Sequence, residues 1–60
     1  MSAWAENAEK MSVEMLWAMA DTNRRHAAIR AAEGKQATAD KYVRQARRLE
    51  AMAMAKEADQ

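Results

Sequence analysis

The chain has a single glycine and no proline in 60 residues, so it offers few places to turn. Glycine after the end of a helix permits the left-handed conformation that a reversal often needs, whereas proline would break a helix. Sixteen alanines, with many Glu, Lys, Arg, Gln and Met residues, favour helix nearly throughout. Strand-forming residues are few and do not alternate with polar ones. We therefore predict one all-α domain over residues 1–60, a two-helix antiparallel hairpin that turns near Gly34.

The helix ends are marked by local signals. Ser2 is a favourable N-cap for the first helix, and Gly34 suits the C′ position after its last turn. We expect the second helix to begin near Gln36–Thr38 and to fray near Ala58. The weak helix formers Asp21-Thr22-Asn23 leave alternatives open, because they favour either a kink in the first helix or the start of a separate one.

Each predicted helix carries an apolar stripe at helical spacing. The stripe on the first helix contains Trp4, Ala8, Met11, Met15, Ala18, Met19, Thr22, His26 and Ile29. The stripe on the second helix is narrower and contains Ala39, Tyr42, Val43, Ala46, Leu49 and Ala53, flanked by Met52. The alanines allow the helix axes to approach closely. We expect these two stripes to bury each other.

The first helix has a second apolar patch, well away from its stripe, formed by Val13, Leu16, Trp17 and Ala20. A two-helix monomer supplies only one partner for two apolar faces, whereas a symmetric dimer would bury both in a four-helix bundle. A chain of this length also buries only about 60% of its unfolded surface. We expect the patch to form a homodimer interface centred on Trp17, since Trp is enriched at interface hot spots. A different protein partner and an irregular monomer core are the alternatives.

Charge is segregated along the chain. Residues 24–48 have a net charge of +6, against −3 for residues 1–23 and −2 for residues 49–60. A hairpin gathers the positive charge at its turn end, and an antiparallel dimer would bring each turn to the other copy's acidic termini. On the second helix, the basic residues expected to bind an anion or an acidic partner are Lys41, Arg44, Arg47 and Arg48. This face could be a solvated surface, a nucleic-acid site or a contact for an acidic protein.

Several function classes lack the residues they need. The chain has no cysteine, and His26 is its only histidine, so we predict no metal site and no cofactor. The acidic residues of the first helix are spread around it, and no nucleophile has a neighbouring base, so we predict no catalytic residues and no enzyme activity. The uncharged apolar run 15–20 is far shorter than the roughly 20 residues of a membrane span. We expect a cytoplasmic protein that does not bind membranes.

These features predict a small regulatory, adaptor or inhibitor protein of the kind that phages and mobile elements often encode. It would bind another protein through a helical surface, as a homodimer. The alternatives are an RNA- or DNA-binding hairpin that uses residues 24–48, and a structural assembly subunit. The expected dimer is similar in architecture to the plasmid-encoded repressor-of-primer proteins, two-helix chains that pair into RNA-binding bundles. That resemblance covers the hairpin and no sequence motif.

Overall fold

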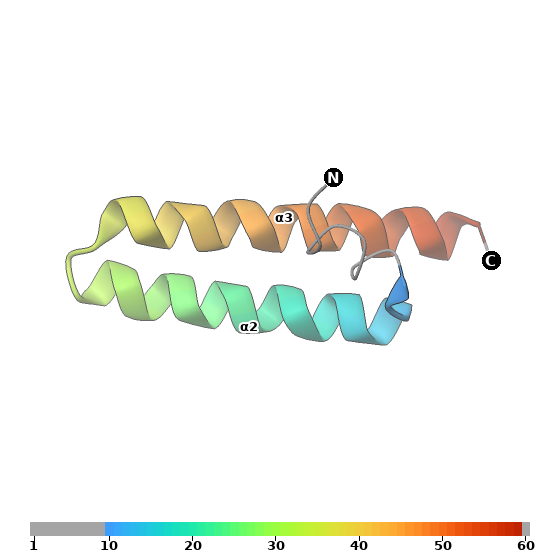
Figure 1. The fold of residues 1–60 in the computed structure, drawn as a ribbon, viewed down its shortest axis with the longest axis horizontal. Helices are drawn as coiled ribbons and strands as arrows, with labels where there is room; N and C mark the ends of the chain where they lie inside the picture. Colours follow the sequence, from blue (N-terminus) through green and yellow to red (C-terminus); the bar gives the residue numbers. More distant parts are fainter. Residues whose placement is uncertain (1–9, 60) are drawn as a thin grey trace.

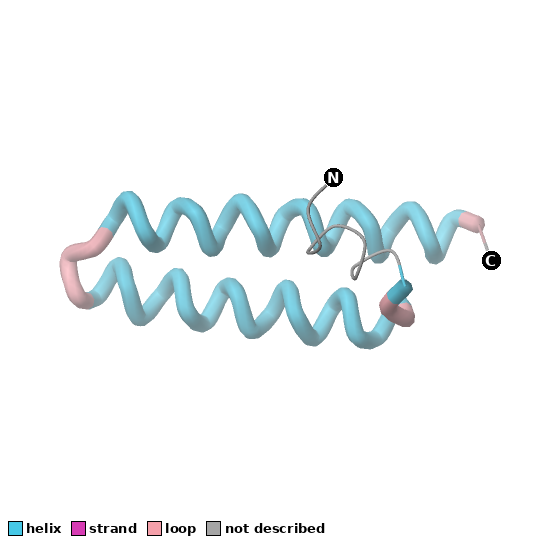
Figure 2. Tube along the Cα trace, viewed as in Figure 1, coloured by secondary structure: helices cyan, strands magenta, loops and turns pink. Residues whose placement is uncertain are grey.

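A computed structural model describes residues 10–59, which form two long helices packed side by side in opposite directions (Figure 1). Helix α2 spans Val13–Ala32 and helix α3 spans Gln36–Ala58. One short loop joins them, and there is no strand among the described residues (Figure 2). The predicted all-α hairpin is confirmed, and α3 begins and ends within the limits expected from its sequence.

Helix α2 begins later than predicted. The expected cap at Ser2 lies outside the described residues, and the N-cap is instead Ser12, whose Oγ accepts a hydrogen bond of 3.2 Å from the backbone N–H of Met15. Ser12 has extended backbone angles, so the prediction of one uninterrupted helix up to Gly34 is wrong at this point. The serine hydroxyl satisfies a backbone donor that has no partner within the first turn, which fixes the start of the helix there.

The three weak helix formers of α2 do not interrupt it. The Thr22 hydroxyl donates to the backbone oxygen of Ala18 at 3.0 Å, and the Asn23 amide donates to that of Met19 at 2.8 Å. Both side chains therefore bond the preceding turn of their own helix and do not compete with its backbone hydrogen bonds. The alternative in which a separate helix starts here is wrong.

The turn is built as the sequence predicts. Gly34 follows Glu33, the C-cap residue of α2. The φ of Gly34 is 81°, in the left-handed region that glycine adopts without a Cβ clash. Its N–H donates to Ala31 O at 3.0 Å, and the N–H of Lys35 donates to Arg30 O at 2.8 Å. This pair of bonds is the Schellman motif, which satisfies two carbonyls at the end of α2 and reverses the chain.

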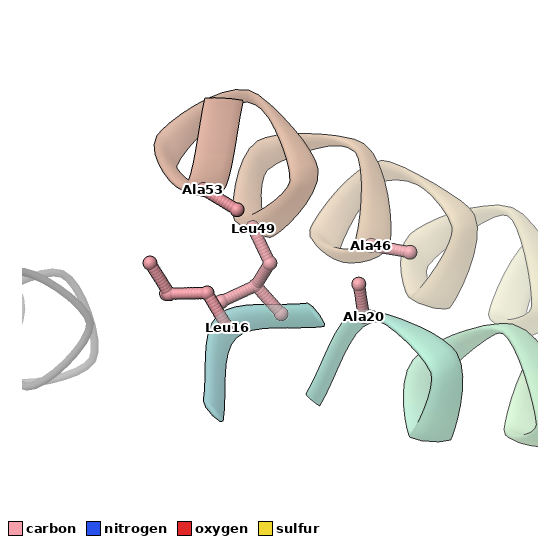
Figure 3. Close-up of a cluster of buried hydrophobic side chains, with 5 residues drawn as sticks. All are labelled: Leu16, Ala20, Ala46, Leu49 and Ala53. Carbon is pink, nitrogen blue, oxygen red and sulfur yellow. The ribbon is translucent and has the colours of Figure 1, made fainter. Parts of the chain in front are cut away.

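The core lies between the helices and consists mostly of alanine. Figure 3 shows side chains of α2 and α3 pointing toward one another, and the buried apolar residues are Leu16, Ala20, Ala27, Ala39, Ala46, Leu49 and Ala53. The predicted stripe of α3 is confirmed, with Tyr42, Val43 and Met52 half-buried at its margins. Leu16 and Leu49 are the two large side chains that the hairpin buries completely. The small side chains between them let the two backbones approach closely.

The predicted stripe of the first helix is not the face that packs. Met15, Met19 and Ile29 are between 40% and 53% exposed, while Leu16, Ala20 and Ala27 face α3. Helix α2 is thus rotated about its own axis by about 100° from the expected orientation, which is the angle between consecutive residues of an α-helix. The face that packs offers Leu16 and small side chains opposite the alanines of α3, whereas the methionines and Ile29 would hold the helices apart. Trp4 and Ala8 lie outside the described residues.

Candidate binding surfaces

The apolar patch predicted as a dimer interface is largely inside the hairpin. Leu16 and Ala20 are 0% and 1% exposed, and Val13 is half-buried against the same core. The expectation that α3 leaves this face free is wrong, because α3 itself covers it. A second copy therefore has no access to Leu16 or Ala20 while the hairpin is formed.

Trp17 is the member of that patch that stays at the surface, with an exposed fraction of 36%. Its indole Nε1 donates a 2.7 Å hydrogen bond to Glu57 Oε1 on α3. Nearby, the Lys56 ammonium donates to the backbone oxygen of Met11. These contacts connect the two ends of the described chain, and they give Trp17 a role within the hairpin that sequence did not predict.

The arginines of α2 already have carboxylate partners. Arg24 forms a bidentate contact with Glu50 of α3, in which Nε donates to Oε2 at 2.8 Å and Nη2 donates to Oε1 at 2.7 Å. Arg25 pairs with Asp21 at 3.0 Å, and Arg30 pairs with Glu33 at 2.6 Å. Glu33 also lies 3.8 Å from Lys35. Four of the eight cations in residues 24–48, the basic block, therefore lie beside three carboxylates, a result that the charge count could not predict.

The Arg24–Glu50 contact shifts both groups toward their charged forms. The hydrogen bond from Arg24 holds the pKa of Glu50 below its ordinary value, against an opposing effect of partial burial, and the positive charges of Arg24 and Arg47 lower it further. The same hydrogen bond, followed by the charge of Glu50, raises the pKa of Arg24. Arg47, one of the residues predicted to bind an anion, thus acts electrostatically on Glu50.

The other three predicted residues form what we call the cationic stripe: Lys41, Arg44 and Arg48. They lie at i, i+3 and i+7 on α3, on the side of the helix away from its buried alanines, and with Gln45 they line an open hollow. Within residues 10–59 no side-chain hydrogen bond or ion pair involves any of the three. The structure therefore brings together three exposed cations that have no counter-ion in the described part of the chain.

The local sequence explains why the cationic stripe is unpaired. Lys41 and Arg48 have no acidic residue three or four positions away on α3. Asp40 lies four residues before Arg44, yet it accepts a 2.9 Å hydrogen bond from Gln36 and forms no ion pair with the arginine. Like charges at these spacings destabilise a helix by about 0.2–0.5 kcal/mol per pair. The hairpin thus carries a small electrostatic cost that an anionic partner would relieve.

A third surface is the exposed apolar face of α2, which we call the α2 seam: Met15, Met19, Thr22, His26 and Ile29. Its His26 stacks on Tyr42 of α3, with ring centroids 5.3 Å apart and an angle of 22° between the rings. Tyr42 is half-buried in this stack and is no open platform for a nucleic-acid base. The α2 seam thus lies about 100° around α2 from the face that packs on α3, and its methionines and Ile29 are exposed within residues 10–59.

Other kinds of site find little support in the part of the chain that the structure describes. Residues 10–59 bring together no group of three His, Asp or Glu side chains that could hold a metal ion. Neither α2 nor α3 has the length and apolar character needed to cross a bilayer. No protein-family model matches the chain, and neither do any curated proteins or solved structures.

Proposed function

We propose that this chain is a small, cytoplasmic, non-enzymatic binding protein that recognises an acidic protein surface through the cationic stripe, with two copies forming a four-helix bundle. The observation that carries the proposal is the set of three exposed cations, Lys41, Arg44 and Arg48, with no counter-ion inside the hairpin. Such a stripe orients a partner of opposite charge and speeds the encounter. Two arginines add donor geometry suited to carboxylates, which they can bind through paired hydrogen bonds.

The extent of the cationic stripe favours a protein over a nucleic acid. Its outer members are seven residues apart, or about 10.5 Å along the helix axis. Carboxylates three, four or seven residues apart on a partner helix would match this spacing. Salt-sensitive nucleic-acid binding often involves roughly six to ten phosphates, whereas Arg24, Arg25 and Arg30 of the basic block are occupied by carboxylates. Within residues 10–59 the stripe also lacks an exposed aromatic neighbour on which a base could stack.

The test is a tagged pull-down from native lysate with two charge-matched variants. The stripe variant carries Lys41→Gln, Arg44→Gln and Arg48→Gln. The control carries Lys10→Gln, Arg25→Gln and Lys35→Gln, which remove the same three charges elsewhere. After nuclease treatment, we expect the wild type and the control to retain the same protein and the stripe variant to lose it, with all three chains equally helical by circular dichroism.

The other outcomes point to the alternatives. Nucleic acid in the untreated sample, with nothing specific left after digestion, would replace the proposal with nucleic-acid binding by the same stripe. Equal retention of one protein by the wild type and the stripe variant would show that the cations do not make the contact. A wild-type chain that self-associates and retains no other macromolecule would favour a structural assembly subunit.

A further inference from the structure

Helix α2 carries two sets of residues with the same spacing, displaced by one position. The buried set is Leu16, Ala20, Asn23 and Ala27, with steps of four, three and four residues. The α2 seam runs from Met15 to Ile29 with steps of four, three, four and three. This alternation is the heptad spacing by which one helix packs along another. The first set packs on α3. The second has the spacing of a helix-packing surface but, apart from the stack of His26 on Tyr42, has no helix against it within residues 10–59.

We propose that the α2 seam packs against the α2 seam of a second copy, with the two hairpins antiparallel. The inference rests on the dimer of the proposed function and names its face and its direction. A helix with two adjacent heptad seams fits a bundle of more than two helices, because each seam needs a neighbour. The α2 seam replaces the patch predicted from sequence, which α3 has covered.

The side chains of the α2 seam are suited to burial. Of the large apolar side chains that are exposed, three belong to it: Met15 at 53%, Met19 at 40% and Ile29 at 50%. Thr22 adds no unsatisfied donor, because its hydroxyl already bonds to Ala18 O. Methionine adapts to irregular surfaces and makes favourable contacts with aromatic rings. The stacked ring of His26 supplies such a surface within the same seam.

The hairpin of residues 10–59 is one helix thick. Its Cα atoms span 40 × 21 × 13 Å, so these residues form a single layer of two helices. Domains are usually built from at least two packed layers. The 40 × 21 Å face has a projected area of about 840 Å² that includes both helices, and this is the most that a second copy could cover, while stable interfaces bury roughly 800 Å² of accessible surface per partner. One second copy is thus enough to cover the face.

Charge selects the antiparallel direction. Residues 24–48, at the turn end, have a net charge of +6, while the described parts of the open end, residues 10–23 and 49–59, sum to −3. A parallel dimer would place the two positive ends together, whereas the antiparallel dimer places each beside a negative end. The cationic stripe lies on the side of α3 remote from α2, so it stays accessible in either arrangement.

The first experiment measures association by sedimentation equilibrium over a range of concentrations. The seam variant carries Met15→Glu and Met19→Glu. The control carries Ala51→Glu and Met54→Glu, which add the same charges at exposed positions of α3. We expect a dimer for the wild type and the control, and a dissociation constant raised about 100-fold or more in the seam variant. A monomeric wild type would overturn the dimer and the inference together, whereas an unchanged dimer in the seam variant would overturn the inference alone.

A crosslinking experiment tests the direction without charging the interface. The natural chain has no cysteine, so Met15→Cys and Ile29→Cys give two chains with one thiol each. These positions are equally distant from Thr22, near the middle of α2. In an antiparallel dimer, a short bismaleimide links the two different variants when they are mixed and links neither efficiently to itself. Self-linking of each variant alone, or no linking in the mixture, would overturn the antiparallel seam.

Discussion

Replacing Leu16 with Ala tests which face of α2 holds the hairpin together. Leu16 is 0% exposed and packs in one cluster with Ala20, Ala46, Leu49 and Ala53. Because Leu16 and Leu49 are the two large side chains that are fully buried among residues 10–59, the loss of either removes a large part of the apolar contact between the helices.

The expected cost follows from the atoms removed. Leu→Ala deletes three carbon groups, worth about 2.4 kcal/mol at roughly 0.8 kcal/mol each. A residual cavity adds to this cost, and measured Leu→Ala changes in one well-studied core reach about 5 kcal/mol. Two helices joined by a single turn can move together and close much of the space, so we expect about 3 kcal/mol. A chain of this size has a total stability of about 3–9 kcal/mol, so the variant should be near its unfolding limit.

The assay is urea unfolding followed by far-ultraviolet circular dichroism at one fixed protein concentration. Leu49→Ala should cost about as much as Leu16→Ala, since both leucines lie in the same cluster. Met54→Ala is the matched control, because Met54 is 56% exposed and its loss should cost well under 1 kcal/mol. If Leu16→Ala costs no more than Met54→Ala, α2 does not pack on α3 through the face described above.

Two further predictions concern the turn and the cross-helix ion pair. Gly34→Ala should lower the free energy of unfolding by about 1–2 kcal/mol, because φ of 81° is unfavourable for an L-residue, although the added Cβ meets no atom within 4 Å. Gly34→Asn should cost less, because asparagine tolerates the left-handed region better. Equal costs of the two variants in urea unfolding would indicate a steric cause instead. The hydrogen bond from Arg24 lowers the pKa of Glu50 in the folded state, so the contact stabilises the hairpin fully at pH values above 4.5, the ordinary pKa of this carboxyl. The stabilisation is lost as the pH falls through the lower pKa of the folded state. The stability advantage of the wild type over Glu50→Gln should therefore be present at neutral pH and vanish in strong acid, and an advantage that persists there would contradict this account.

The parts of the fold that sequence predicted correctly are those set by local signals. Gly34 is the one residue suited to a left-handed turn, and the stripe around Ala46 and Leu49 is the one continuous apolar face of α3. Ser12 is also a local signal, but the stronger helix propensity of its neighbours masked it.

The face of α2 could not be chosen from its own sequence. The seams that begin at Met15 and Leu16 have the same spacing, and the first contains more large apolar residues. The choice between them depends on the fit to α3, whose alanines favour the seam with smaller side chains. Asn23 obscured that seam further, because a side-chain amide is expected in a buried position only where its hydrogen bonds are satisfied. Asn23 is 7% exposed, and its amide donates to the backbone oxygen of Met19 in the same helix.

The cationic surface was partly predictable for a related reason. The block of positive charge is visible in the sequence, and so is the absence of acidic neighbours around Lys41 and Arg48. The neutralisation of Arg24 by Glu50 joins residues 26 positions apart and depends on how the helices align. Sequence therefore located the charge correctly, while the tertiary structure determined which cations remain without a counter-ion.

The two proposed contacts differ in the force that holds them. The α2 seam is mainly apolar, and burial of apolar surface is not weakened by moderate salt. The cationic stripe is exposed, and its attraction for carboxylates is screened over a Debye length of about 8 Å at physiological ionic strength. A dimer formed through Met15 and Met19 would therefore persist in salt that releases an acidic partner from Arg44 and Arg48. The hairpin would then act as half of a stable bundle, whose two outer edges each present one set of unpaired cations.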